Sequence, residues 1–119
     1  MKFIWLVHHD ETAFEQMSDK TKKGLLTESI GLCHQLDAKG EYVHASPVHP
    51  AATAAIVRVR EGTPIVTDGP FIETREQMAG YFLIEGKDRD AAVAIAGRVP
   101  GARIGTVEVR QVREITGLP

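Results

Sequence analysis

The chain has 119 residues, of which 43% are hydrophobic and 25% charged, a composition typical of one globular domain with its own core. Fourteen basic and sixteen acidic residues give a formal net charge of −2, so the chain lacks the basic excess of most nucleic-acid-binding proteins. The apolar run near the start, FIWLV, is too short to cross a membrane or to form the core of a signal peptide. We therefore expect one soluble domain over residues 1–119, with no nucleic-acid and no membrane partner.

Residues 2–8, KFIWLVH, predict a strand, because they are rich in β-branched and aromatic side chains. Alternate side chains of a strand point to opposite faces, and here both faces are apolar: Phe3, Trp5 and Val7 on one, Ile4 and Leu6 on the other. The strand therefore needs cover on both sides.

Two helix starts follow the first strand. Thr12 with Glu15 has the spacing of a capping box, and Ser18 is the predicted N-cap of a longer helix that Gly40 ends. Apolar and small side chains of this longer helix recur on one stripe, formed by Leu25, Ser29, Leu32 and Leu36. Such a stripe is wide enough to pack one face of the helix on a sheet.

The middle of the chain predicts a strand and a hairpin. Residues 41–47, EYVHASP, form a short second strand, and the alternating residues 53–69 form a hairpin that turns at Glu61-Gly62. Thr74 with Gln77 predicts a second capping box, for one helical turn that Gly80 would end.

The last third predicts a strand at 81–85, an Ala-rich helix with Asp88 as N-cap and Pro100 beyond its end, and a strand at 104–112. The tail from about residue 113 is expected to be loose or to cap a dimer.

The order of the predicted elements is β-α-β, hairpin, β-α-β, an α+β ferredoxin-like plan. Two helices cover one face of such a sheet, and a second copy of the chain is the simplest cover for the other. A homodimer is therefore expected.

The stretch VTDGPFIETREQMAGYFLIEG, with KFIWLVHHDE before it and GTVEVRQV after it, resembles the DGPF-domain branch of the YCII-related family. The resemblance covers residues 2 to about 112, and its most specific part is Asp68-Gly69-Pro70-Phe71. It implies a dimeric α/β barrel of ferredoxin-like protomers. Some members have been proposed as enzymes with a His–Asp pair, and one class resembling this domain removes chloride from chlorinated hydroxyquinols. The position that matches the histidine is Ser29 here, so this pair is not carried over.

Residues 67–80 allow two interpretations. As structure, Asp68-Gly69 is a turn and the residues behind it form a cap. As a site, Asp68 and Glu73 are polar groups at a cleft that orient a ligand or take a proton. The sequence leaves both interpretations open.

Four histidines near strand ends are further candidates. His8 and His9 lie at the end of the first strand, face opposite ways, and are natural general bases near pH 7. His44 and His49 flank Pro47, but no metal-binding spacing is present, so no metal site and no cofactor are expected. The single cysteine, Cys33, cannot form an intramolecular disulfide, which favours a cytoplasmic location, and it is expected to pack as a small hydrophobe.

Two functional hypotheses follow. In the first, a pocket binds a small organic molecule and, if the protein is an enzyme, it is a cofactor-free lyase or isomerase. The catalytic candidates are His9, His8 and Asp68, and the substrate-binding candidates are Trp5, Asp10, His49, Phe71 and Glu73. In the second, the chain is a non-catalytic module that senses a ligand or binds another protein, for example in transcription regulation.

Overall fold

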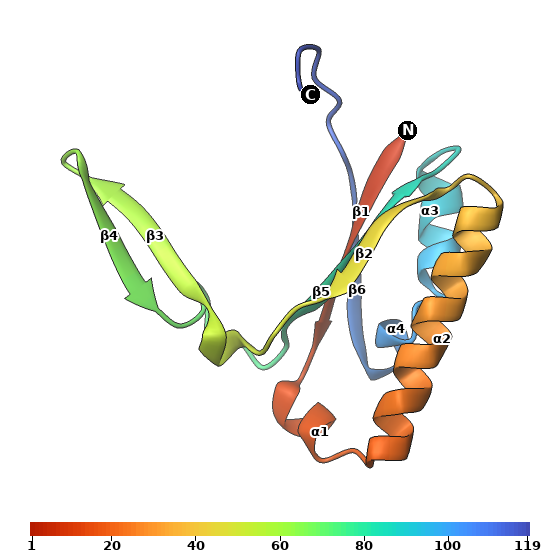
Figure 1. Cartoon of the computed structure of the whole chain (residues 1–119), viewed down its shortest axis with the longest axis horizontal. Helices are drawn as coiled ribbons and strands as arrows, with labels where there is room; N and C mark the ends of the chain where they lie inside the picture. Colours follow the sequence, from red (N-terminus) through yellow and green to blue (C-terminus); the bar gives the residue numbers. More distant parts are fainter.

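The computed structural model describes residues 1–119 as an antiparallel sheet of four strands with helices on one face and a separate hairpin (Figure 1). The sheet has the order β2-β5-β1-β6. Its strands are β1 (Lys2–His9), β2 (Tyr42–Pro47), β5 (Gln77–Glu85) and β6 (Gly105–Gln111). The helices are α1 (Glu11–Glu15), α2 (Asp19–Ala38), α3 (Arg89–Ala96) and α4 (Gly101–Ile104), with a 3-10 turn, η1 (Ala51–Thr53). This arrangement confirms the α+β class and is compatible with a ferredoxin-like plan.

The core lies between the sheet and the helices. Phe3, Trp5 and Val7 of β1 are buried on this side, as the alternation of the strand predicts, and Phe82 of β5 packs on Trp5 with ring centroids 5.6 Å apart. The helices contribute Leu32, Leu36, Ala92 and Ala96, and Val99 completes the core. The opposite face of the sheet, which carries Ile4 and Leu6, has no helix over it (Figure 1) and is called the open face below.

Two of the predicted helix caps are present. The Ser18 hydroxyl accepts a hydrogen bond from the Thr21 backbone N–H at 3.1 Å, and an Asp88 carboxylate oxygen accepts one from the Ala91 N–H at 2.8 Å. The first short helix begins earlier than predicted, because Asp10, and not Thr12, is its N-cap. No helix is long and apolar enough to cross a membrane.

The predicted helical turn at Thr74–Gln77 is wrong. Residues 70–76 form an irregular loop, and Gln77 is the first residue of β5, which is longer than the expected strand at 81–85. Gly80, expected to end the turn, is buried inside β5. A side chain there would approach the Ser46 carbonyl oxygen to 2.8 Å, so glycine allows β2 to lie close to β5.

The hairpin is formed by β3 (Ala55–Arg60) and β4 (Thr63–Asp68), and extends away from the rest of the fold (Figure 1). Its turn is at Glu61 and Gly62, as predicted, and both residues have positive φ, the geometry of a tight hairpin turn. The radius of gyration is 16.2 Å, whereas a compact chain of this length has about 13–14 Å. The difference reflects this projecting hairpin.

Candidate functional site

Two cavities lie on opposite faces of the sheet. The first, which we call the helix-side cavity, has a volume of about 220 Å³ and lies between α2 and the buried face of the sheet. Its walls are mostly apolar. They include Val7, Phe14, Leu25, Leu26, Ile30, Ala45, Pro47, Phe82, Val99, Pro100 and Ile104. A largely apolar lining with a few polar groups is typical of a site for a small organic molecule, and the volume limits this one to a very small ligand.

His9 is the titratable base of the helix-side cavity. It ends β1 on the face of Val7, so its ring turns toward the helices, and it stacks on Phe14 of α1 with centroids 4.6 Å apart. Burial lowers the pKa of His9 below its usual value of 6.5, although the nearby carboxylates of Glu11 and Asp10 act in the opposite direction. The imidazole is therefore neutral near pH 7 and can accept a proton or a hydrogen bond.

Other polar groups of this cavity come from α2. The Ser29 hydroxyl donates a hydrogen bond to the Leu25 carbonyl oxygen at 2.9 Å, which satisfies it within the helix. Ser29 is the position at which the resemblance places a histidine, so the helix-side cavity contains both this position and His9. Cys33 also lines the cavity, and burial raises the pKa of its thiol, which disfavours the nucleophilic thiolate.

The second cavity, which we call the open-face cavity, lies at the base of the hairpin against the open face and has a volume of about 820 Å³. It brings together three of the predicted site residues, His8, His49 and Phe71. Its other polar lining includes Glu76, Gln77, Thr74, Thr106 and Glu108. No group of three or more histidine, cysteine or carboxylate side chains is arranged to hold a metal ion.

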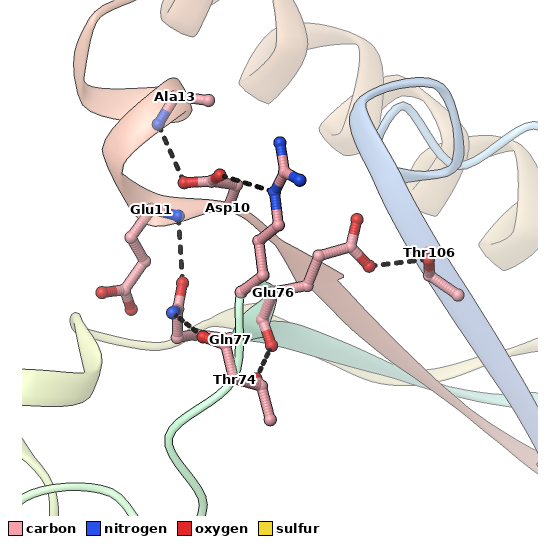
Figure 2. Close-up of polar contacts among 8 residues, drawn as sticks. Asp10, Glu11, Ala13, Thr74, Glu76, Gln77 and Thr106 are labelled. Carbon is pink, nitrogen blue, oxygen red and sulfur yellow. Dashed lines mark hydrogen bonds and ion pairs between the residues drawn. The ribbon is translucent and has the colours of Figure 1, made fainter.

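The loop before β5 is tied to the junction of β1 and α1 (Figure 2). The Gln77 side-chain oxygen accepts a hydrogen bond from the Glu11 backbone N–H at 3.0 Å, and Arg75 Nε lies 3.7 Å from a carboxylate oxygen of Asp10. Glu76 accepts a hydrogen bond from the Thr106 hydroxyl at 2.8 Å. These contacts connect the end of the loop to β1, α1 and β6.

The predicted site residues do not converge on one site. His9 faces the helix-side cavity and His8 the open-face cavity, which shows that adjacent strand residues keep opposite orientations here. Trp5 is fully buried in the core, Asp10 caps α1, and the exposed Asp68 ends β4. Neither cavity is lined by any of these three or by Glu73.

Of the lining residues of the helix-side cavity, only His9 was a predicted site residue, and Phe14 and Lys22 are among those that sequence reasoning missed. The position of Lys22 was visible in the pattern, because it precedes Leu25 by three residues and Ser29 by seven, and residues so spaced share a helix face. Nothing in the sequence alone indicated that Phe14 of a different helix would stack on His9.

Comparison with known families matches residues 1–116 to the YCII-related domain. Among curated proteins, the uncharacterized protein R00369 of Rhizobium meliloti (strain 1021) is similar to this chain. The two are 29% identical over 112 residues, which covers 92% of this chain and 90% of the relative.

Proposed function

The chain belongs to the YCII-related family, and we propose that its helix-side cavity binds a small organic molecule on which His9 acts as a base. The similar protein of Rhizobium meliloti is itself uncharacterized, so this function is inferred from the cavities of the chain. The observation that carries the proposal is an imidazole with lowered pKa that lines a mostly apolar cavity. A neutral base that is partly shielded from water suits removal of a proton from a carbon acid, the step shared by cofactor-free isomerases and lyases.

Cavity occupancy is tested first. Benzamide, a neutral aromatic probe, is titrated into the protein by calorimetry. Ser29→Phe, which inserts a ring into the cavity, is expected to abolish its binding, whereas Thr27→Phe on the exposed side of the same helix leaves binding unchanged. Binding that persists in Ser29→Phe would place the probe elsewhere.

Proton transfer is tested with a simple carbon acid. Incorporation of deuterium from D2O into phenylacetone is followed by NMR, and the wild-type protein is expected to accelerate it. His9→Gln should remove the acceleration, because an amide is not a base near pH 7. If His9→Gln accelerates exchange as well as the wild type, His9 is not the base. Binding without any acceleration would favour the alternative, a non-catalytic ligand sensor.

We also propose that the chain works as a homodimer through its open face and its hairpin. Val57, Val59 and Val66 lie on one face of the hairpin and are 66%, 59% and 65% exposed. A two-stranded hairpin alone is marginally stable in water, so this apolar face needs a partner. Ile4 and Leu6 of the open face need one too, and a twofold pairing can cover both surfaces at once.

Charge supports the same pairing. Arg58 and Arg60 of the hairpin form no ion pair with a carboxylate of the chain. Glu108 on the open face forms no ion pair with a basic side chain. A dimer that brings the hairpin to the partner's open face can pair these charges. This assembly would correspond to the dimeric barrel that the resemblance implies, and the Asp68–Phe71 tetrad supports placing the chain in the DGPF branch.

Native mass spectrometry tests the assembly. The wild type is expected at twice 13.0 kDa. Val66→Glu should shift the population toward monomer, since it places a charge on the hairpin's apolar face, while Val93→Glu on the exposed side of α3 should not. A monomeric wild type would contradict the dimer, and a dimeric Val66→Glu would exclude the hairpin from the interface.

A further inference from the structure

Lys22 is the only charged side chain that lines the helix-side cavity. The lining contains no aspartate and no glutamate, and its remaining polar residues are His9, Ser29, Cys33, Ser46 and Tyr81. Because His9 is neutral near pH 7, the charge of this cavity is that of one ammonium group. A ligand that neutralises it would have to bring its own negative charge.

The Lys22 ammonium is held at the edge of the cavity. Its Nζ lies 5.5 Å from the centre of the Phe14 ring, the same ring on which His9 stacks. It also donates a hydrogen bond to the Glu15 carbonyl oxygen at 3.3 Å, so its position is constrained. Phe14 is therefore in contact with both the cation and the neutral base of the cavity.

The intramolecular ion pair of Lys22 is weak enough to be replaced. Its partner, the Glu15 carboxylate, is 3.6 Å away and 68% exposed, whereas the Lys22 side chain is only 25% exposed. Exposed pairs with this geometry contribute little, since water screens them. An anion bound inside the cavity would meet the same ammonium in a less polar setting, where the attraction is stronger.

The volume sets the size of the ligand. A cavity of about 150 Å³ can hold benzene, so 220 Å³ accommodates a six-membered ring with one small substituent. We propose that the natural ligand is a small organic anion, with an apolar ring-sized body between α2 and the sheet and a single anionic oxygen group, a carboxylate or a phenolate, at Lys22. This inference rests on the proposed function of the cavity and adds the charge class of its ligand.

The test compares benzoate with benzamide, which have the same shape and differ in charge. In calorimetric titrations at low salt, the wild type is expected to bind benzoate about fivefold more tightly, an ion pair of about 1 kcal/mol. Added salt should reduce this preference. Lys22→Met should remove the preference, so that benzoate no longer binds more tightly than benzamide, because methionine keeps the apolar stem but carries no charge.

Lys23→Met is the matched control. Lys23 is the next residue of α2, is exposed, and does not line the cavity, so this variant should retain the preference for benzoate. Thermal unfolding of both variants checks that the fold is intact. The inference of an anionic ligand is overturned if the preference survives in Lys22→Met, or if the wild type binds both probes with equal affinity. Either result leaves the proposed function of the cavity standing. Failure of both probes to bind the wild type at millimolar concentration overturns the two together.

Discussion

The imidazole of His9 stacks on the ring of Phe14 with an interplanar angle of 21°, although the two residues belong to different elements, β1 and α1. Asp10 is the N-cap of α1, so the helix begins directly after His9, the last residue of the strand. The stacking removes one face of the imidazole from water, and burial is the main cause of its lowered pKa.

The pKa of His9 should therefore depend on Phe14. In an NMR titration of the histidine ring protons, His9 is expected below 6.5 in the wild type, and Phe14→Ala should raise its pKa by exposing the ring. Thr12→Ala, an exposed change in the same helix, is the control and should leave the value unchanged. An unchanged pKa in Phe14→Ala would mean that other walls of the cavity cause the desolvation.

The same shift predicts a dependence of stability on pH. A histidine whose pKa is lower in the folded state than in the unfolded one binds fewer protons when folded, so its contribution favours folding at high pH. Stability should fall as the pH drops through about 6.5 and the contribution should be lost below the folded pKa. Urea unfolding at a series of pH values should show a shallower decline for His9→Gln. Identical declines in both proteins would mean that His9 does not carry the effect.

Cys33 should react slowly in the folded protein. Its thiol is partly buried and its pKa is raised, so little thiolate is present near neutral pH. Because it is the only cysteine, the rate of reaction with Ellman's reagent reports on this one site. Unfolding in urea should raise this rate strongly. In the folded protein, benzamide bound in the helix-side cavity should lower the rate below that of the ligand-free protein. A folded protein that reacts as fast as the unfolded chain would contradict the packing of α2 on the sheet.

Gly105 should be the glycine least tolerant of substitution. It pairs with His9 at the start of β6, and a methyl group there would overlap the carbonyl oxygen of His8. Gly105→Ala is expected to lower the free energy of unfolding by about 1–3 kcal/mol or more, as overpacking does. Gly24→Ala is the contrast, since a methyl group there meets no atom within 4 Å, and it should stabilise α2 by about 0.5–1 kcal/mol. Denaturant midpoints of the two variants should move in opposite directions.

Local patterns were sufficient for most of the fold. The alternation in β1, the caps at Ser18 and Asp88, and the turn at Glu61-Gly62 all depend on neighbouring residues, and each is present. The capping-box pattern at Thr74 and Gln77 failed because Gln77 pairs with His9 in the sheet, and its side-chain oxygen accepts from Glu11, which is 66 residues away in sequence. No local rule contains a contact of that kind.

The candidate site was less accessible to sequence reasoning than the fold. Alternation placed His9 on the side of Trp5 correctly, but which side holds the helix-side cavity depends on the helices that cover it. Lys22 and Phe14 reach the cavity from two helices, and their distance from His9 is set by how these helices pack. Asp68 was attractive because it belongs to a distinctive tetrad, yet its exposed side chain lines neither cavity, although Pro70 and Phe71 beside it line the open-face cavity.

The central position of β1 has a consequence for how the chain is made. Its two neighbours, β5 and β6, follow all the other strands in the sequence, so the first strand has no partner until residues 77–85 of β5 have left the ribosome. Sheets built from such distant pairings form slowly, because a long loop must close before any contact compensates for the lost entropy. Until then FIWLV is an exposed apolar segment prone to aggregate, and the yield of folded protein should depend on chaperones that bind nascent chains.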